Sequence, residues 1–556
     1  MISVWQRRWR LCFGQQSCSL ISVGVSGRPA SAMTSKIFKM RKFGGVGSLI
    51  TFSKSYIIQQ IRLFKHIFHL IKRMFHASYF TDCTSKETKS IKNKLLSGDA
   101  WACAHLFVSS NFYLASKLDI LLIGTKMTIS YLKKAKKTPQ SGNDETRKIV
   151  ADMLAKIEVG GEKAALAYGR DLDGYDGDAI VSDDIIANSA ERVSSQLKSD
   201  IQFAYDRVTK FAEAQLASIS EFETELSPGL WAGQKTIPIE TAGCYVPGGR
   251  YAHVASAIMS IATAKVAGVT NVIACTAPNG KEGPNSGIIY AMNLCGADTI
   301  LSLGGVQGIV SMANGLFTGK PARILVGPGN RFVAEAKRML YGRVGIDMFA
   351  GPTEIAVIAD DSADAGVVAE DLVSQAEHGP DSPAWLITTS RKIANDVMEQ
   401  MDRHINALPE IARNAATLAW RDYGEVILCD TDEEAAQISD EYAAEHLEVH
   451  TNKDEWYTAR LKNYGSLFIG EETTVTYGDK CSGTNHILPT KGAAHYTGGL
   501  SVHKFLKIVT TQRMTKDANR EVGQAAARIS RLEGMEGHAR AADVRLRKYF
   551  PGENLG

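Results

Sequence analysis

Residues 355–390 read IAVIADDSADAGVVAEDLVSQAEHGPDSPAWLITTS, and the succession of patterns within them indicates the fold class. The opening run, IAVIA, is short and wholly apolar, which is typical of a strand buried on both faces. A segment with helical spacing of apolar residues follows and stops at Gly379-Pro380, a pair that ends helices. The next apolar run, PAWLITT, comes shortly afterwards. Strand, helix and strand in this order predict two parallel strands joined by a helix.

The same alternation continues on both sides of this stretch. The apolar runs VTNVIACTA, ADTILSLGG and ARILVGPG precede it, EVILCDT follows it, and amphipathic helical segments lie between many of them. We therefore expect an α/β fold with two Rossmann-like parallel-sheet units in residues 236–510, one before and one after the helix around Val373. Residues 127–235 are predicted to form a helical N-terminal region, and residues 511–556 a charged helical tail.

The N-terminal extension, residues 1–126, differs in charge from the rest of the chain. It contains 19 Lys and Arg against 4 Asp and Glu, whereas the remainder contains 44 against 56. An acidic body argues against nucleic acid as its partner. The Arg- and Ser-rich opening resembles an organelle transit peptide; the alternative that we favour is upstream sequence joined by a gene-model error to a true start at Met127. The expected location is cytoplasmic, or organellar if the extension is a genuine transit peptide.

Two further features bear on the surroundings of the protein. No run of 18 uncharged apolar residues occurs, so we predict no membrane span, although residues 56–75 have a basic amphipathic pattern that could lie on a membrane surface. The nine cysteines include no Cys-x-x-Cys pair, which favours reduced thiols over a disulfide framework. Cys275 and Cys429 lie in apolar runs and are expected in the core.

Two pairs of polar residues stand at the ends of predicted elements. Gln375 and His378, near the end of the predicted helix, are three residues apart, so they share one side of it, as two ligands of one metal must. Glu445 and His446 precede the strand-like run LEVH, where a carboxylate and an imidazole could serve as two bases in sequential proton transfers. Taken alone, either pair has an ordinary structural interpretation.

Two Gly-containing segments carry further polar groups. YGDKCSGTNHILPT contains Asp479 and His486, and EGMEGH in the tail contains Glu533 and His538. Each of these side chains, taken singly, is equally a loop cap or a surface group. Their functional interpretation depends on the order in which these motifs occur along the chain.

Taken in order, the motifs of the chain resemble those of histidinol dehydrogenases. The matching segments are YVPGG (245–249), GPGN followed by FVAEAKR (327–338), AGPTE (350–354), SQAEHGPDS (374–382), EHL (445–447), SGTNHILPT (482–490) and the terminal EG…H. The resemblance covers essentially everything after Met127. It implies a zinc-dependent dehydrogenase that oxidises a primary alcohol to a carboxylate with NAD.

The resemblance also implies the metal centre. Zinc would be held by four side chains, which are those of Gln375, His378, Asp479 and His538. The last of these would come from the partner subunit, so we expect a homodimer whose C-terminal tail is exchanged. A glutamine oxygen is an uncommon zinc ligand, and coordination rules alone do not suggest it.

Catalytic and binding roles follow from the same resemblance. His446 would remove the alcohol proton, and Glu445 would activate water for attack on a bound aldehyde. The cofactor site would include Tyr245, Gln307 and Asn330. The substrate site would be lined by Thr353, Gln375, His378, Glu445, His486 and Glu533. No G-x-G-x-x-G follows a strand in the body, so the prediction of NAD as the cofactor depends on the resemblance. The GPGN segment before a predicted helix is nevertheless suited to binding an anionic group.

Departures from the histidinol pattern indicate the substrate. Lys504 stands where those enzymes usually have Asp, and Lys480, Arg250 and His253 add further basic side chains. A small anionic alcohol is therefore favoured over cationic histidinol. These features resemble the sulfopropanediol dehydrogenase branch, which oxidises 2,3-dihydroxypropane-1-sulfonate to sulfolactate. Histidinol is the alternative substrate; the alternatives from other classes are a zinc hydrolase in which Glu445 activates water and a noncatalytic metal-binding scaffold.

Overall fold

The structure, a computed structural model, describes residues 129–138, 144–248, 251–348 and 351–553, together with two short strands nearer the N-terminus. These strands, β1 (Phe38–Lys39) and β2 (Leu49–Ile50), pair antiparallel. The chain divides into two compact units, Met1–Thr125 and Lys126–Gly556, and every further element belongs to the second. The predictions for Met127, for residues 56–75 and for Arg250 lie outside the described residues. None of the described helices is long and apolar enough to cross a membrane.

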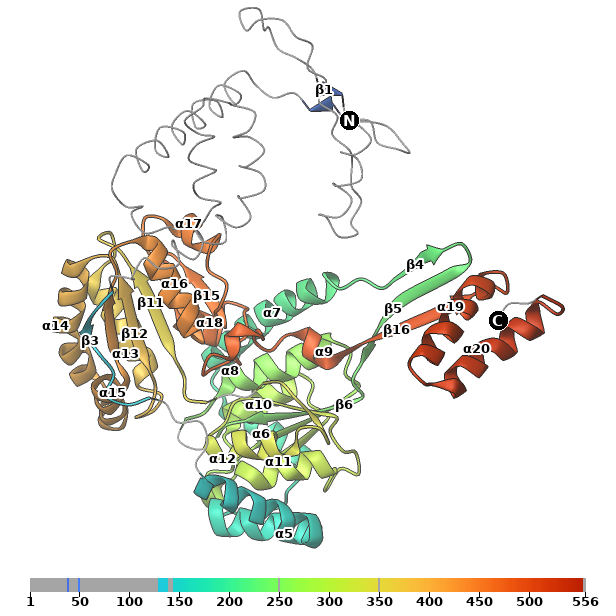
Figure 1. Cartoon of the computed structure of the whole chain (residues 1–556). Helices are drawn as coiled ribbons and strands as arrows, with labels where there is room; N and C mark the ends of the chain where they lie inside the picture. The colour runs from blue at the N-terminus through green and yellow to red at the C-terminus, as the bar shows by residue number, and fades with distance from the viewer. Residues whose placement is uncertain are drawn as a thin grey trace, which may run out of the picture. The chain divides into compact units, whose positions relative to one another are not determined.

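The first α/β unit contains a five-stranded, all-parallel sheet with the order β10-β9-β6-β7-β8. Its strands are β6 (Thr241–Val246), β7 (Asn271–Thr276), β8 (Thr299–Ser302), β9 (Ile324–Val326) and β10 (Gly345–Ile346). The helical segments between them are α8 (Val254–Ala257), η2 (Ile258–Ala262), α9 (Thr263–Val266), η3 (Gly280–Glu282), α10 (Ser286–Leu294), α11 (Gly305–Asn314) and α12 (Arg331–Leu340). α8, α9 and α10 cover one face of the sheet, and α11 and α12 cover the other (Figure 1).

The second α/β unit contains a six-stranded sheet with the order β15-β14-β11-β12-β13-β3. Five of its strands are parallel, namely β11 (Ile355–Ala359), β12 (Ala384–Thr388), β13 (Glu425–Leu428), β14 (His446–His450) and β15 (Ser466–Ile469). Its helices are α13 (Ala365–Ala376), α14 (Arg391–Ala407), α15 (Glu410–Tyr423), α16 (Asp432–Tyr442), α17 (Asp454–Thr458) and α18 (Val475–Lys480). The strand–helix–strand interpretation of residues 355–390 is confirmed by β11, α13 and β12.

The boundary between the two units differs from the sequence prediction. It lies between β10 and β11, because β11 pairs with β12 and β14 of the second sheet. The helix around Val373, α13, therefore belongs wholly to the second unit and does not separate the units as expected. Short apolar runs such as IAVIA predict a buried strand but do not show which sheet it joins.

The N-terminal region is mainly helical, with an unexpected edge strand. Its helices are α5 (Asp144–Tyr168), the π-helical turn η1 (Gly169–Asp173), α6 (Asp183–Arg192) and α7 (Ser195–Ala217). They pack on the first unit, α5 against α11 and α12, and α6 against α10. β3 (Ser130–Lys133) instead joins the second sheet, antiparallel to β13.

A separate antiparallel sheet, which the sequence did not indicate, leads to the C-terminal tail. It has the order β16-β5-β4, with β4 (Phe222–Ser227), β5 (Leu230–Pro238) and β16 (Leu506–Met514). Two short 3-10 turns, η4 (Ala493–His495) and η5 (Val502–Phe505), precede β16. The helices α19 (Ala518–Leu532) and α20 (Glu536–Tyr549) follow and pack chiefly on each other.

The central parallel strands of both sheets are buried on both faces. Successive residues of β11, such as Val357 and Ile358, belong to different apolar clusters on the two sides of the second sheet. This arrangement explains why the strands read as continuous apolar runs. Cys275 and Cys429 are buried free thiols, which confirms their predicted place in the core.

Candidate active site and metal centre

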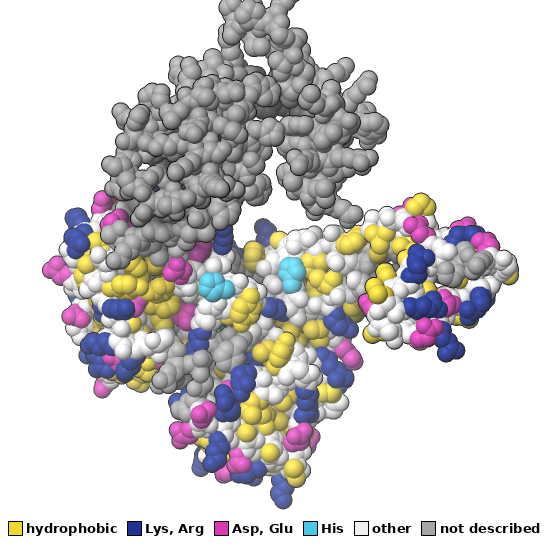
Figure 2. Space-filling model, viewed as in Figure 1, with side chains coloured by type: hydrophobic (Ala, Val, Ile, Leu, Met, Phe, Trp, Pro, Cys, Tyr) yellow, Lys and Arg dark blue, Asp and Glu magenta, His cyan; other side chains and the backbone are white. Residues whose placement is uncertain are grey.

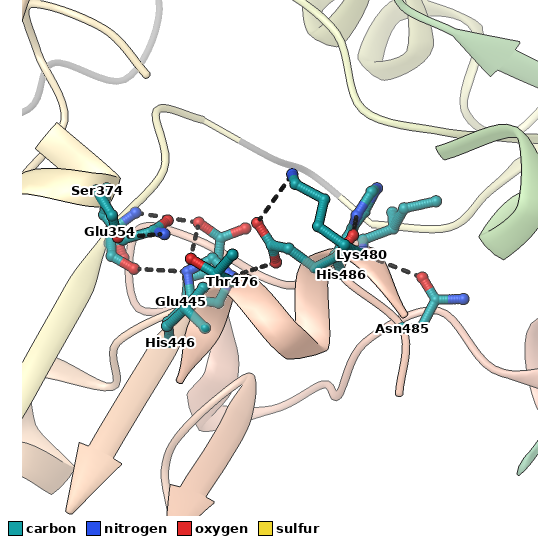
Figure 3. Close-up of polar contacts among 12 residues, drawn as sticks. Glu354, Ser374, Glu445, His446, Thr476, Lys480, Asn485 and His486 are labelled. Atoms are coloured by element: carbon teal, nitrogen blue, oxygen red, sulfur yellow. Dashed lines mark hydrogen bonds and ion pairs between the residues drawn. The ribbon is translucent and has the colours of Figure 1, made fainter. Parts of the chain in front are cut away.

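Two neighbouring parallel strands begin at the predicted catalytic pair. β14 starts at His446, directly after Glu445, and β11 starts directly after Glu354. The backbone amide of Glu354 donates to the Glu445 carboxylate at 3.0 Å. Two carboxyl groups and an imidazole, all buried, thereby meet at the N-terminal edge of the second sheet (Figure 3).

The contacts of His446 determine which ring nitrogen is available for chemistry. Nδ1 lies 3.0 Å from the backbone carbonyl oxygen of Glu354, so the neutral ring carries its proton at Nδ1 and donates it there. Nε2 is buried, has no hydrogen bond with any described residue, and lies 3.5 Å from the Asp479 carboxylate. A neutral His446 therefore presents a free lone pair at Nε2, as a general base must.

Burial shifts the protonation of this group of side chains. It raises the pKa of Glu445 to about 8 and that of Glu354 to about 7. Burial alone would lower the pKa of His446, but the charges of Glu445 and Asp479 act against it and raise that pKa to about 9. Groups with such pKa values exchange protons near the working pH of an enzyme, which favours acid–base chemistry here.

The predicted metal ligands of the body lie at the ends of two helices. Gln375 is in the last turn of α13, His378 follows that helix, and Asp479 is in α18. Burial lowers the pKa of His378 to about 4, so its imidazole is neutral and able to ligate. Burial would raise the pKa of Asp479, but the adjacent His446 outweighs it and holds the pKa below its usual value.

Two of these side chains have buried oxygens without a partner. Gln375 Oε1 and Asp479 Oδ1 form no hydrogen bond with any residue that the structure describes. Leaving such an acceptor unpaired costs about 1–3 kcal/mol, and a bound cation would remove that cost. A neutral imidazole, a carboxylate and an amide oxygen are acceptable zinc donors, so the residues present fit the predicted metal.

His486 links the segment that carries Asp479 to the first α/β unit. Its Nε2 lies 2.8 Å from Ser256 Oγ in α8, and its Nδ1 lies 2.8 Å from the backbone oxygen of Asp479. His253 precedes α8 in the same unit. Its pKa is lowered to about 4, first by burial and then by His486, His378 and Lys480. Both α/β units therefore contribute side chains around the predicted metal centre.

The remaining predicted substrate residues of the body differ in their surroundings. Lys480 Nζ lies 4.0 Å from the Asp479 carboxylate (Figure 3). Lys504, in η5, donates to Thr497 Oγ1 at 3.0 Å, and among the residues that the structure describes no hydrogen bond or ion pair joins it to the catalytic pair. Thr353 is half-buried and directly precedes Glu354.

The predicted site residues of the tail are not brought to the site within one chain. Glu533 directly follows α19, His538 lies in α20, and both are exposed. In Figure 1 these helices lie beyond the three-stranded antiparallel sheet, away from α13 and α18. A second copy would have to supply them.

The predicted cofactor residues gather at the C-terminal edge of the first sheet. In the order β10-β9-β6-β7-β8, the chain places β7 and β8 on one side of β6 and then β9 and β10 on the other. Ligands of open parallel sheets bind at such a switch point, which here lies between β6 and β9. Tyr245 is at the end of β6, and its hydroxyl accepts from the Gly305 amide at 3.0 Å. Gln307 Nε2 donates to Asp173 at 2.9 Å, and Asn330 caps the N-terminus of α12.

The GPGN turn after β9 passes close to the end of β6. Gly327 has φ 116°, and a Cβ there would lie 2.0 Å from the Tyr245 carbonyl oxygen, so only glycine fits. Its amide donates to Asp347 at 2.8 Å, and its carbonyl accepts from Lys337 Nζ at 2.9 Å. A buried ion pair thus fixes this turn before α12, at the switch point.

Three residues of the site were missed or left without a role by the sequence analysis. Glu354 lies within the quoted AGPTE motif, and a carboxylate immediately before a wholly buried strand was the available signal. His253 was noted only as a basic residue. Ser256 carried no signal, because its contact with His486 spans 230 residues.

Comparison with known proteins agrees with this geometry. The family model described as histidinol dehydrogenase matches residues 136–546. The chain belongs to the histidinol dehydrogenase family. It is 62% identical over 424 residues to a histidinol dehydrogenase homolog of Pelagibacter ubique, covering 76% of this chain and 99% of that one. It is 57% identical over 429 residues to the sulfopropanediol 3-dehydrogenase of Ruegeria pomeroyi, covering 77% and 99%.

A solved structure of the family supports the fold. The crystal structure of histidinol dehydrogenase from Elizabethkingia anophelis matches with a TM-score of 0.70 at 33% identity, over 74% of this chain and 94% of that one. The predicted α/β fold class and family are thereby confirmed. Membership in the histidinol dehydrogenase family makes the chain an oxidoreductase acting on CH–OH groups, in a family that uses NAD and zinc.

Proposed function

We propose that the chain catalyses the zinc- and NAD-dependent, four-electron oxidation of a primary alcohol to a carboxylate through a bound aldehyde. The favoured substrate is (R)-2,3-dihydroxypropane-1-sulfonate, which would give sulfolactate. The observation that carries the proposal is the buried pair of bases, Glu445 and His446, beside the unpaired oxygens of Gln375 and Asp479. One base suffices to oxidise an alcohol to an aldehyde, whereas continuing to the acid requires a second group that activates water.

The proton transfers follow from the contacts of the pair. His446 would take the hydroxyl proton at Nε2, because Nδ1 is engaged by the Glu354 carbonyl. Glu445, held by the Glu354 amide, would take a proton from the water that attacks the aldehyde. Bound zinc would hold and polarise the substrate oxygen, and bound NAD would accept a hydride in each oxidation.

The ligand positions are part of the same proposal. Gln375, His378 and Asp479 would hold zinc together with the partner's His538. The cofactor would lie at the switch point, lined by Tyr245, Gln307 and Asn330. The substrate would be bordered by Thr353, Gln375, His378, Glu445, His486, Lys504 and the partner's Glu533.

A single lysine beside the site favours an anionic substrate. Lys480, whose side chain is 58% exposed, lies next to Asp479 and supplies the positive charge, whereas His253 is neutral near physiological pH because its pKa is lowered to about 4. A sulfonate would gain more from a cation in this partly buried site than in water. The 57% identity to a protein named sulfopropanediol 3-dehydrogenase supports the same choice, whereas the Geobacillus kaustophilus protein named histidinol dehydrogenase is 36% identical.

The substrate is tested by comparing kcat/KM for dihydroxypropanesulfonate and L-histidinol with the purified full chain, zinc and NAD. We expect the sulfonate to be preferred, and Lys480→Met to lower its kcat/KM by about tenfold, equal to about 1.4 kcal/mol. Lys320→Met, at an exposed position in the first unit, is the matched control and should leave the preference unchanged. Preference for histidinol would contradict the assignment.

The pH dependence of turnover is a further expected result. Both bases act in their deprotonated forms, and both pKa values are raised, to about 8 for Glu445 and about 9 for His446. Activity should therefore be low at neutral pH and increase as pH rises through these values. Initial rates of NADH formation in buffers of constant ionic strength measure this, and a rate independent of pH across the range would refute it.

The C-terminal tail supports a homodimer. Four of its apolar side chains remain uncovered in one chain, and one of them, Leu532, is 89% exposed. The others are Ile529, Met535 and Val544. Figure 2 shows hydrophobic side chains of the tail next to Lys, Arg, Asp and Glu. Burial of these groups against a second copy would stabilise a dimer and bring His538 and Glu533 to the partner's site.

A further inference from the structure

A second group of ionisable side chains lies deeper in the second α/β unit, between α13 and β14. Asp371 is one helical turn before Gln375 on α13. Glu448 and His450 are two and four residues after His446 on β14, so all three share one face of the strand. The predicted chemistry of the active site uses neither Asp371, Glu448 nor His450.

These three side chains are removed from solvent. Glu448 is 0%, His450 2% and Asp371 8% exposed. One oxygen of each carboxyl group is satisfied, because Thr474 Oγ1 donates to Asp371 Oδ1 and the Val475 amide donates to Glu448 Oε1, both at 2.8 Å. The start of α18 therefore fixes both carboxyl groups.

The other atoms of the group have no hydrogen-bond partner. Asp371 Oδ2, Glu448 Oε2 and both ring nitrogens of His450 form no hydrogen bond within the part of the chain that the structure describes. Burial of that many unpaired polar atoms is unfavourable unless something binds them. Three of these atoms, one from each side chain, lie close together.

The spacing of these atoms suits the ligands of one ion. The three ligand atoms lie within 4.8 Å of one another. His450 Nε2 is 3.6 Å from Glu448 Oε2 and 4.0 Å from Asp371 Oδ2, distances that are too long for hydrogen bonds. Two ligands bonded to zinc at about 2.0–2.2 Å stand about 3.3–3.6 Å apart, so the three atoms would move together by up to about 1 Å and a water would occupy the fourth position.

We propose that Asp371, Glu448 and His450 bind a second divalent cation of the Zn²⁺ class, distinct from the catalytic metal. Two carboxylates and a neutral imidazole balance the charge of such an ion and provide the oxygen and nitrogen donors that it prefers. The ion joins α13 to β14. It thereby fixes the helix that carries Gln375 relative to the strand that carries His446.

Protons are the competing occupants of this group. Burial, together with the charge of Glu448, raises the pKa of Asp371 to about 7. A protonated Asp371 and a protonated His450 beside an ionised Glu448 would also be neutral overall. Counting metal ions separates the two possibilities, because the protonated group needs no ion.

The experiment measures zinc in the full chain by plasma mass spectrometry after loading with excess ZnCl₂ and desalting. We expect two zinc ions per chain. One zinc ion per chain in the wild-type protein that the Glu448→Gln variant retains would overturn the proposal, and enzymatic activity does not enter the measurement. Failure of the proposed reaction would therefore leave this result interpretable.

Variants assign each ion to its site. Glu448→Gln and His450→Gln should each contain one zinc ion, and Asp479→Asn should lose the other one. His404→Gln is the matched control, because His404 contacts Glu370 on the outer side of α13 and should leave two ions bound. If Glu448→Gln does not fold, the nearly isosteric Asp371→Asn replaces it. A folded Glu448→Gln or Asp371→Asn protein that still binds two ions would overturn the proposal.

Discussion

Replacing His446 by asparagine is expected to lower kcat for alcohol oxidation by about 10²–10⁴-fold, the range for loss of a general base. The reason is geometric: Nδ1 is engaged by the Glu354 carbonyl, and Nε2 carries the free lone pair. Stopped-flow absorbance at 340 nm measures the first hydride transfer directly. His495→Asn, at an exposed position, is the control and should retain full activity. A His446→Asn enzyme with a wild-type first step would refute the assigned role.

Glu445→Gln should separate the two oxidations. The amide oxygen can still accept from the Glu354 amide, so the site should retain its shape. The variant should form one NADH per site rapidly and then stop, because glutamine cannot take the proton of the attacking water. An equal loss of both steps would mean that Glu445 positions His446 and has no separate role.

The second large effect concerns the tail. Asp479→Asn and His538→Asn should each abolish turnover, because each removes a predicted zinc ligand. If the tails are exchanged, a mixed dimer of the two variants has one site with both substitutions and one site with neither. Co-expression should therefore restore roughly a quarter of the wild-type activity, since about half of the dimers are mixed and each has one intact site.

The outcome of mixing is decisive for the exchanged tail. If His538 acted within its own chain, every site of a mixed dimer would lack one ligand, and co-expression would restore nothing. The exposed positions of His538 and Leu532 in one chain lead us to expect restoration. Two affinity tags, one on each variant, isolate the mixed dimer for the assay.

The fold could be predicted from the sequence where local patterns determine it. Buried parallel strands such as β11 and β12 read as apolar runs, and Gly379-Pro380 follows the end of α13. The pairing of strands depends on contacts between distant segments. For this reason the sequence did not predict β3, whose partner β13 is almost 300 residues away, or the exposed β4–β5–β16 sheet.

The candidate site was predictable to a similar extent. Helical spacing identified Gln375 and His378 as candidate site residues, and their adjacency identified Glu445 and His446 as a candidate pair of bases. Glu354 contacts His446 from 92 residues away, and only the parallel register of β11 and β14 reveals this. The cluster of Asp371, Glu448 and His450 could not be predicted for the same reason, since a helix and a strand must pack together to form it.

The most direct test of the account is the number of NADH molecules formed when a limiting amount of dihydroxypropanesulfonate is consumed completely by the wild-type full chain with zinc and excess NAD. The two-base site predicts two NADH per substrate and sulfolactate as the product. One NADH per substrate, with the aldehyde accumulating, would contradict the role of Glu445, and no NADH formation would contradict the substrate assignment itself.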